Sequence, residues 1–208
     1  MLSEGLDREA DDHEEDDVVT LTRLWLSERN GAELLPFASD VIERTLELVA
    51  AQNASVDALA TDESDAGFVH SVYSLELERI RFVLRSYMRT RIHKIETHTG
   101  ALLKNPEYRA RMSEDELAYA EQFNRITLEN YKKSFLDEAC PPSLQTLDDA
   151  ETANNPNLNQ AVFCRVRRDI GPHLLPTGDT INLTKDKIYL LHYRTVKPFV
   201  ITGEVDLI

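Results

Sequence analysis

Several residue types that build catalytic or membrane-spanning sites are scarce in this chain of 208 residues. Only seven glycines are present, and no GxGxxG, GxxxxGK[ST] or GxSxG pattern occurs, which argues against phosphate-binding loops and nucleophile elbows. The two cysteines, Cys140 and Cys164, are too few for a disulfide framework and form no CxxC pair. No apolar run reaches the roughly 18 residues of a membrane span, and no signal peptide is recognisable. We therefore expect a soluble, intracellular chain with no membrane partner.

The histidines give no catalytic or metal-binding pattern. His93 and His98 are five positions apart, whereas two ligands on one helix face need a spacing of three or four. The chain has no HExxH motif and no paired Cys/His spacing of a zinc site. The sequence therefore predicts no catalytic residue, no metal site and no cofactor, and we expect a protein that is not an enzyme.

Acidic charge is concentrated at the N-terminus. Nine acidic residues against one arginine in residues 1–17 account for −8 of the net charge of −14. A charge run with so little to bury predicts a disordered tail. Affinity for duplex DNA comes mainly from lysine and arginine. The composition therefore argues against free-standing DNA binding, although a local basic patch stays open.

The stretch 72–98 is the most regular part of the chain, because it has neither proline nor glycine and its apolar residues recur at helical spacing. One apolar stripe of the expected helix contains Tyr73, Leu77, Ile80, Leu84, Tyr87, Met88 and Ile95. A second, shorter strip contains Val72, Leu75 and Phe82. A helix with apolar residues on two sides must be covered on two sides. We therefore predict that a partner chain covers part of it, and we place most of the candidate interface residues on the first stripe.

The same helix carries the basic residues of the chain's middle part. Arg81, Arg85 and Arg89 form an i, i+4 ladder that is a candidate contact for single-stranded nucleic acid. Arg91 falls where the first stripe requires an apolar residue. An arginine at such a position usually faces a carboxylate of a partner chain. We expect Arg91 to form a salt-bridged interface, with nucleic-acid contact as the alternative for the ladder.

Further helices are predicted on both sides of this stretch. Residues 18–29 form the first, which carries Trp25 as a core or interface anchor and ends at Asn30-Gly31. Residues 39–52 form the second, with Ser39 as N-cap, and a mobile loop follows over 53–66. Asp16 or Asp17 is the expected N-cap of the first helix, and the central helix is expected to stop near Gly100, before Asn105-Pro106 breaks any helix. A helix over 113–139 starts with the capping box Ser113 and Glu116 and ends before Pro141. Its apolar stripe contains Leu117, Ala120, Phe123, Ile126 or Thr127, Tyr131 and Phe135. Together residues 18–140 are expected to form a helical bundle domain.

The texture of the chain changes after residue 140. Residues 141–160 are polar and aperiodic and are interpreted as a linker. Short β-type runs follow at 161–167, 188–193, 197–201 and 205–208, with a further short strand at 180–183. About 48 residues is marginal for an independent domain, and the apolar end of the chain is best explained if it packs against something. Val205, Leu207 and Ile208 are therefore interface candidates. The expected fold class is a helical domain followed by a small β-rich domain.

Three stretches together resemble the Sld-five-type subunits of GINS, a four-subunit assembly of replication initiation. They are residues 21–37, 75–96 and 188–208, in order and with similar spacing. The resemblance implies a helical A domain and a small β-rich B domain. It also implies a heterotetramer with three paralogous sister subunits, which joins the MCM ring and a Cdc-type helicase partner protein in the active replicative helicase. The implied role is scaffolding in the nucleus, with at most indirect contact to DNA.

The resemblance also assigns places to particular residues. It puts the Trp25 helix and the helix over 79–96 in the core of the assembly, and it matches residues 205–208 to the strand that closes the B domain. In some relatives the N-terminal segment docks a replisome adaptor through a hydrophobic-acidic peptide. Leu2 and Leu6 are a weak match to such a peptide. The alternative function, read from the residues alone, is a single-strand-binding module that uses the basic helix.

Overall fold

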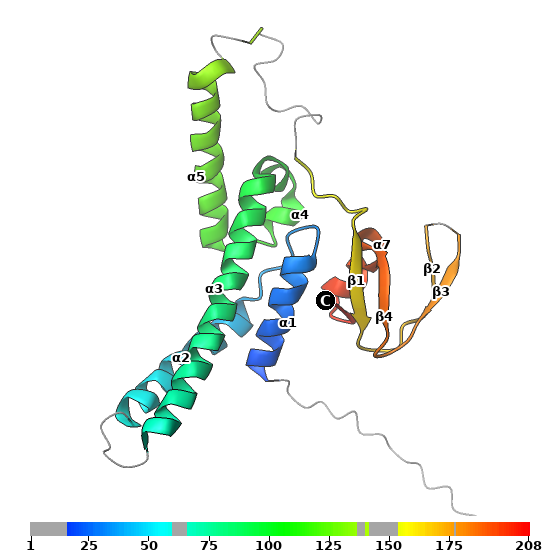
Figure 1. Ribbon diagram of the computed structural model, residues 1–208. Helices are drawn as coiled ribbons and strands as arrows, with labels where there is room; N and C mark the ends of the chain where they lie inside the picture. The colour runs from blue at the N-terminus through cyan, green and yellow to red at the C-terminus, as the bar shows by residue number, and fades with distance from the viewer. Residues whose placement is uncertain (1–15, 60–65, 137–139, 142–153, 177) are drawn as a thin grey trace, which may run out of the picture.

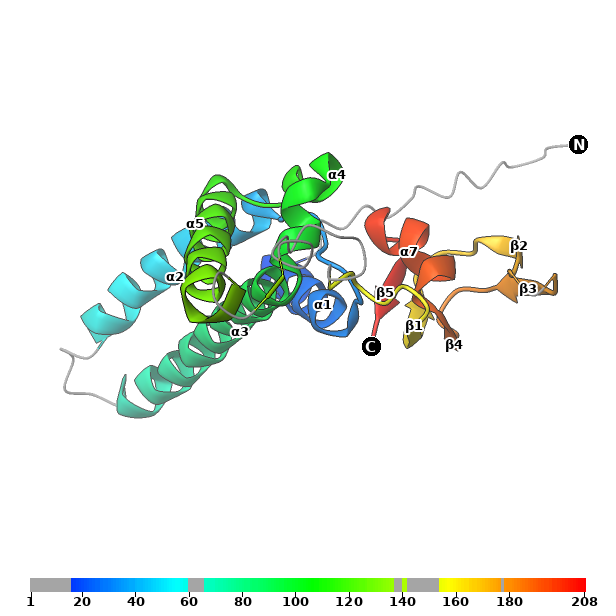
Figure 2. The same ribbon diagram turned by 90° about the horizontal axis from the view of Figure 1, so that it is seen from above.

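The protein has a helical bundle followed by a small C-terminal domain with antiparallel strands, as the sequence predicts (Figure 1). The computed structural model describes residues 16–59, 66–136, 140–141, 154–176 and 178–208. The predictions for the tail over 1–15 and for most of the linker over 141–160 lie outside these residues. In the view of Figure 2 the helices of the bundle lie on one side of the molecule, and the strands lie on the other together with the C-terminal helix.

Helix α1 (Asp17–Asn30) has the ends that the sequence predicts. The Asp16 side chain caps it by accepting a hydrogen bond of 3.2 Å from the backbone nitrogen of Val18. At the other end, a Cβ atom on Gly31 would lie only 2.9 Å from the Ser27 carbonyl oxygen and 3.6 Å from the Leu207 side chain. Gly31 therefore ends the helix and lets the C-terminal strand approach closely.

Helix α2 (Ser39–Leu59) is longer than predicted. Ser39 is its first residue rather than its N-cap, and its hydroxyl donates to the neighbouring Asp40 carboxylate. The expected loop over 53–66 is wrong for residues 53–59, which continue the helix. The reason is tertiary, because Val56 lies in an apolar cluster with Val49 and Leu77 that only a continued helix can complete.

Helix α3 (Ala66–Lys104) runs along the whole bundle (Figure 1). It begins before the predicted start and passes through Gly100, where the sequence predicted its end. The backbone leaves helical geometry only at His98 (φ −116°, ψ 19°). The Asn105-Pro106 pair then breaks the helix as predicted, since Asn105 caps the short helix α4 (Pro106–Arg109) and Pro106 is its first residue.

Helix α5 (Glu114–Tyr131) starts with the predicted capping box. The Ser113 hydroxyl accepts from the Glu116 backbone nitrogen at 3.2 Å, and the Glu116 carboxylate accepts from the Ser113 nitrogen at 3.1 Å. The helix was predicted to reach residue 139 unchanged, but it widens into the π-helix η1 (Lys132–Leu136). Figure 1 shows its C-terminal half extending beyond the end of α3.

The C-terminal domain contains two small sheets. Strands β1 (Ala161–Val166), β4 (Ile188–His192) and β5 (Val205–Leu207) form an antiparallel sheet in the order β4-β1-β5. Strands β2 (Gly171–Leu174) and β3 (Thr180–Leu183) form a separate hairpin. The sheet packs its inner face on helix α7 (Tyr193–Ile201), which lies between β4 and β5 in the chain.

The predicted strand over 197–201 is wrong, because these residues belong to α7. Tyr193, Val196 and Val200 lie three and four positions apart and pack on the core of the sheet. That core contains Val162, Cys164 and Val166 of β1. The β-branched and aromatic residues of the segment suggested a strand, but their spacing fits the one helix that covers this side of the sheet.

Candidate protein-binding surfaces

Ordinary markers of a catalytic or membrane site are missing from the part of the chain that the structure describes. There, no group of three or more His, Cys, Asp and Glu side chains could hold a metal ion. Nor is any described helix long and apolar enough to cross a bilayer. Cys164 is buried in the β-domain core, and burial raises the pKa of its thiol to about 11, so it is a poor nucleophile.

Two of the three arginines of the ladder on α3 share one carboxylate of the same helix, Glu78. Arg81 donates to Glu78 at 2.5 Å and to the Asn53 side-chain oxygen at 2.6 Å. Arg85 also reaches Glu78, at 3.3 Å. The hydrogen bond from Arg81 lowers the pKa of Glu78, so this carboxylate keeps its charge. Arg89 is exposed and makes no ion pair among the described residues, so it alone of the three resembles a free phosphate contact.

The expectation that Arg91 pairs with a carboxylate of a partner chain is wrong. Its side chain is 0% exposed and forms a bidentate pair with Glu116, at 2.7 and 2.8 Å. It also contacts Glu28 at 3.1 Å. Both carboxylates belong to this chain, on α5 and α1, because the first stripe of α3 faces these helices. Arg91 therefore ties three helices together and is not an open binding residue.

A second buried carboxylate, Glu33, lies between the two domains. It follows α1 and is 0% exposed. On the helical side it accepts from the Tyr108 hydroxyl at 2.8 Å and pairs with Arg111 at 3.1 Å. On the β-domain side it pairs with Lys197 of α7 at 2.9 Å and accepts from the Tyr193 hydroxyl at 3.3 Å. Glu33 therefore connects α7 to the helical bundle.

These buried charges form one set, which we call the junction cluster. Its members are Glu28, Glu33, Arg91, Lys94, Arg111, Glu116 and Lys197. Burial alone would raise the pKa of Glu33, but hydrogen bonds from Lys197, Tyr108 and Arg111 outweigh it and hold the pKa below its usual value. Burial, together with the charge on Glu33, raises the pKa of Tyr108 to about 12. The cluster is fully partnered and serves packing.

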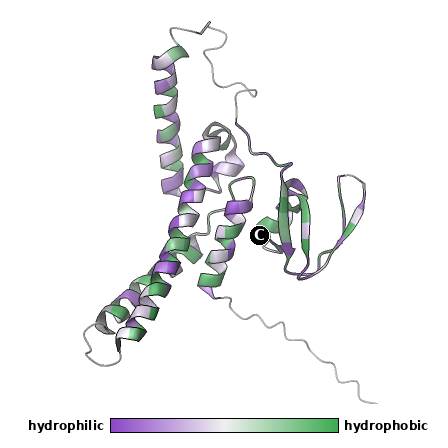
Figure 3. Cartoon of the chain, in the orientation of Figure 1, coloured by the Kyte–Doolittle hydropathy of each residue, from purple (hydrophilic) through white to green (hydrophobic). Residues whose placement is uncertain are grey.

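Helix α3 also carries large apolar side chains on its exposed surface. The second strip predicted from the sequence, Val72, Leu75 and Phe82, is exposed along α3, with Leu75 at 75%. Phe68, which precedes the predicted stretch, continues this strip by one turn and is 79% exposed. We call these four residues the α3 strip. Hydrophobic residues are visible in green on this arm of the molecule in Figure 3.

Trp25 of α1 borders the α3 strip. Its ring makes an edge-to-face contact with Phe82, with the centroids 6.2 Å apart. Its indole nitrogen donates to the Ser86 hydroxyl at 2.9 Å. Trp25 is only half-buried, so part of the ring is left beside Phe82 as a potential anchor for a partner.

A second exposed apolar set lies on α5 and η1. We call it the α5 set; its members are Tyr119, Ile126, Tyr131 and Phe135. The rings of Tyr131 and Phe135 contact each other with centroids 5.8 Å apart, and Tyr119 stacks on Phe123 at 6.1 Å. The apolar stripe predicted for this helix includes Ile126, Tyr131 and Phe135 but not Tyr119, and the spacing gave no reason to separate the inward from the outward members.

The interface residues predicted from the sequence fall into three groups. Leu77, Leu84, Tyr87, Val205 and Leu207 are buried within this chain's own cores and are not available to a partner. Ile80, Met88 and Trp25 are half-buried. Tyr73 and Ile208 are exposed. Helix α3 is apolar on two sides, as its sequence predicts. Most of the predicted interface residues, however, lie on the side of α3 that packs within this chain.

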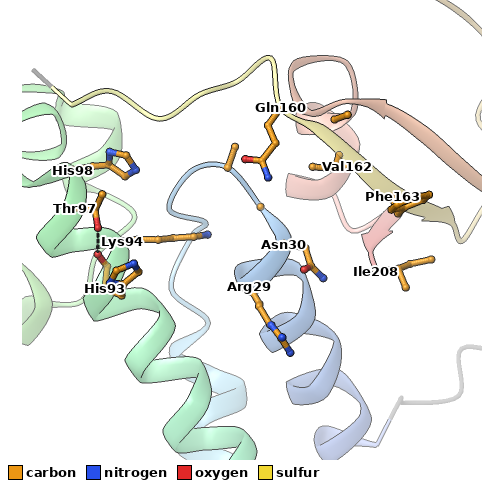
Figure 4. A pocket seen from close by; sticks show the side chains of 13 residues that line it. Arg29, Asn30, His93, Lys94, Thr97, His98, Gln160, Val162, Phe163 and Ile208 are labelled. Carbon is orange, nitrogen blue, oxygen red and sulfur yellow. Dashed lines mark hydrogen bonds between the residues drawn. The ribbon is translucent and has the colours of Figure 1, made fainter.

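A cavity of about 360 Å³ lies where the two domains meet (Figure 4). In Figure 4 one wall comes from α3 and the end of α1, with His93, His98 and Arg29, and the other from β1 and the C-terminus, with Phe163 and Ile208. His98 contacts the Asn154 carbonyl oxygen through Nδ1 at 2.6 Å, which holds the chain entering β1 against α3. The cavity is lined by Arg29 and Lys94, by neutral polar and histidine side chains and by apolar side chains, without an acidic side chain.

Comparison with known proteins agrees with this architecture. A family model described as the GINS complex protein helical bundle domain matches residues 41–135, and one described as the DNA replication complex GINS protein SLD5 C-terminus matches residues 156–208. The chain is 31% identical to DNA replication complex GINS protein sld5 of Schizosaccharomyces pombe, over 93% of this chain and 92% of the relative. It is 34% identical to SLD5 of Chaetomium globosum, over 94% and 91%. Identity to human SLD5 is 30%, over 92% and 88%.

Proposed function

Since the chain belongs to the SLD5 family of DNA replication complex GINS proteins, we propose that it is a non-catalytic scaffold subunit of a GINS complex in the nucleus. In this proposal it assembles with three paralogous subunits into a heterotetramer. The tetramer joins the MCM ring and a Cdc-type helicase partner protein to form the active replicative helicase, in initiation and elongation of DNA replication. The names of the relatives support the GINS membership and the role in replication.

The exposed α3 strip is the observation that carries the proposal. Single exposed apolar residues are common on protein surfaces, whereas contiguous apolar rows mark interaction sites. Phe68, Val72 and Leu75 form such a row on α3, and Phe82 lies about two turns further along, beyond the exposed Arg79. The α5 set adds exposed apolar side chains on another helix. A subunit held permanently between other chains needs more than one such surface, because obligate interfaces are large and apolar. We infer that sister subunits cover the α3 strip and the α5 set.

The alternative, a single-strand-binding module, has less support. Nucleic-acid affinity requires lysines and arginines that can release counterions from phosphates. Arg81 and Arg85 are engaged with Glu78, and Arg79 is paired with Glu76 at 2.6 Å. The exposed Arg89 alone does not make a phosphate-binding track. The role of the tail as a docking peptide for a replisome adaptor stays a prediction.

Co-expression with three sister subunits tests the proposal. We expect one complex with one copy of each chain, seen as a single mass by native mass spectrometry, and poor solubility of the chain expressed alone. A matched control omits one sister at a time and should leave incomplete or aggregated material. The proposal would be overturned if the chain were a compact, cooperatively melting monomer that does not bind the sister subunits.

A further inference from the structure

The sheet of the C-terminal domain is apolar on both faces. Its inner face packs on α7 through Val162, Cys164 and Val166. On the outer face Phe163 of β1 lies directly opposite Leu190 of β4, and each is 57% exposed. On the other side of β1, the Ile208 nitrogen donates to the Phe163 carbonyl at 3.0 Å, and the Ile208 side chain is exposed. An apolar row therefore crosses all three strands on the face opposite α7.

No element within the described residues covers this row. Antiparallel sheets with one solvated face normally alternate apolar residues on the buried face with polar residues on the solvated face. Here three positions of the exposed face are apolar, namely Phe163, Leu190 and Ile188. Both edges of β1 are paired, with β4 and β5. β1 itself therefore cannot accept a further strand, and the apolar row that it carries is open on the face of the sheet, where a helix can pack.

Two hollows separate this face from the helical bundle and give an added element room. One is the cavity of Figure 4, between Phe163, Ile208 and the end of α1. The other, of about 520 Å³, lies along α1 and is lined by apolar Val19 and Leu26 opposite Ile208. A helix lying on the sheet beside α1 would contact the walls of both hollows.

The charge around this face is positive, although the chain as a whole carries −14. Arg165 lies on the same face as Phe163, two residues along β1, and is exposed. Arg29 and Lys94 line the cavity of Figure 4. The second hollow is lined by Arg23, Arg79 and Arg165 together with the acidic Asp16, Glu76 and Asp206, so the two hollows carry five basic against three acidic side chains. Asp206 is the acidic residue of the outer face, and Arg23 and Arg167 already pair with it at 3.3 and 3.7 Å. Residues 154–208 contain seven basic and five acidic residues.

We propose that the outer face of the β4-β1-β5 sheet binds an amphipathic helix of a partner protein, whose apolar stripe is flanked by aspartate and glutamate. The row Leu190, Phe163 and Ile208 takes the apolar stripe, and Arg165 and Arg29 face the flanking carboxylates. A second copy of this chain is a poor occupant, because it would bring the same positive rim against this one. This surface is separate from the α3 strip and the α5 set, and the proposal goes beyond the scaffold function.

Binding of designed helical probes tests the proposal on the full chain, in the assembly in which it is purified. The first probe is a labelled 18-residue helix with leucines at i, i+3, i+4 and i+7 spacing and glutamates beside them; the second has lysines in place of the glutamates. Fluorescence anisotropy should show that the glutamate probe binds and that added salt weakens this binding. The lysine probe should bind at least about tenfold more weakly than the glutamate probe. Equal binding of both probes, or no binding of the glutamate probe, would overturn the proposal.

Two variants locate the surface. Phe163→Glu should weaken binding of the glutamate probe by about tenfold or more, because it removes the central anchor and adds a like charge. Leu174→Glu changes an exposed leucine of β2 in the same domain, outside the row, and should bind as the unchanged chain. Circular dichroism checks that both variants keep their folds, and Leu190→Glu repeats the test if Phe163→Glu does not fold. Binding that survives both substitutions in the row contradicts the proposal.

Further measurements separate other occupants and the proposed function. If the chain self-associates and Phe163→Glu abolishes the self-association, a second copy of the chain is the occupant of the face. If a thymidine 20-mer binds more tightly than the glutamate probe, the occupant is nucleic acid. Either result overturns the proposal. Assembly with the sister subunits is measured on the same variants by native mass spectrometry. An intact tetramer that does not bind the probe refutes the helix-binding face alone, whereas probe binding without a tetramer refutes the scaffold function alone.

Discussion

The junction cluster and the α3 strip reverse the usual distribution of polar and apolar residues. Between the domains, Glu33 and Arg91 are 0% exposed and are surrounded by partners of opposite charge. On the outer side of α3, large apolar residues face outward. Buried ion pairs contribute little net stability compared with apolar packing, but they fix geometry because breaking one is costly. The comparison shows that buried charge reinforces the junction between the domains, whereas part of the apolar surface of α3 is left uncovered by this chain.

The largest effect is expected from Glu33→Ala. The change leaves Arg111 and Lys197 without their buried carboxylate, so the free energy of unfolding should fall by about 3–5 kcal/mol. Urea unfolding followed by circular dichroism measures this loss. The control is Glu121→Ala, which removes an exposed pair with Arg109 and should cost less than about 1 kcal/mol. Similar small losses in both variants would show that the junction cluster does not hold the domains together.

The apolar side of the comparison is tested by Leu75→Ser and Ile126→Ser. Both side chains are exposed, so the stability of the chain should change by less than about 0.5 kcal/mol. Assembly with the sister subunits should weaken by at least about 2 kcal/mol, or roughly 30-fold, for a buried interface anchor. Titration of the complex with native mass spectrometry or analytical ultracentrifugation measures it. Leu174→Ser is the control, and unchanged assembly of all three variants would remove α3 and α5 as interfaces.

Arg91→Lys sharpens the difference between buried and exposed arginines on one helix. Lysine cannot reproduce the bidentate pair with Glu116 or the donations to the Leu35 and Arg111 carbonyls, at 2.8 and 3.1 Å. We expect a loss of about 2 kcal/mol in the free energy of unfolding. Arg89→Lys, on the exposed side of α3, should change it by less than about 0.5 kcal/mol. Equal losses would place Arg91 outside the structural core.

The smallest expected effect is that of pH on the stability that Glu33 contributes. The pKa of Glu33 is held below its usual 4.5 in the folded chain, so its stabilising contribution is complete above that value and is lost as the pH falls through the folded pKa. Unfolding free energies of the wild type and Glu33→Gln should therefore differ by a constant amount between pH 7 and about pH 5.5. The difference should shrink below about pH 4.5. A difference that grows on acidification would contradict the sign of this linkage.

Local signals in the sequence located several helix ends correctly. Asp16 caps α1, the Ser113–Glu116 box opens α5, and Asn105-Pro106 separates α3 from α4. Each of these depends on side-chain and backbone groups within a few residues, so a short window contains the whole cause. The same reasoning failed for α7, where residues 197–201 were predicted as a strand. That segment follows a helical period only because it covers one face of the sheet.

The binding surfaces were predictable only in part. The sequence identified α3 as apolar on two sides, and the α3 strip that it named is exposed. It could not decide which side packs internally, and so it assigned Leu77, Leu84 and Tyr87 to an interface although they form the bundle's core. It also missed the outer face of the sheet as a whole, because that face becomes one surface only when β1, β4 and β5 pair.

The sequence by itself determined the division into a helical and a β domain, the capped helix starts and the surplus of apolar surface, since composition, periodicity and capping act locally. Tertiary structure alone decided where the buried charges find their partners. Arg91 meets Glu28 across 63 positions, and Glu33 meets Lys197 across 164. No local pattern links residues so far apart, because the free energy of such a pair depends on the desolvation that the whole fold imposes.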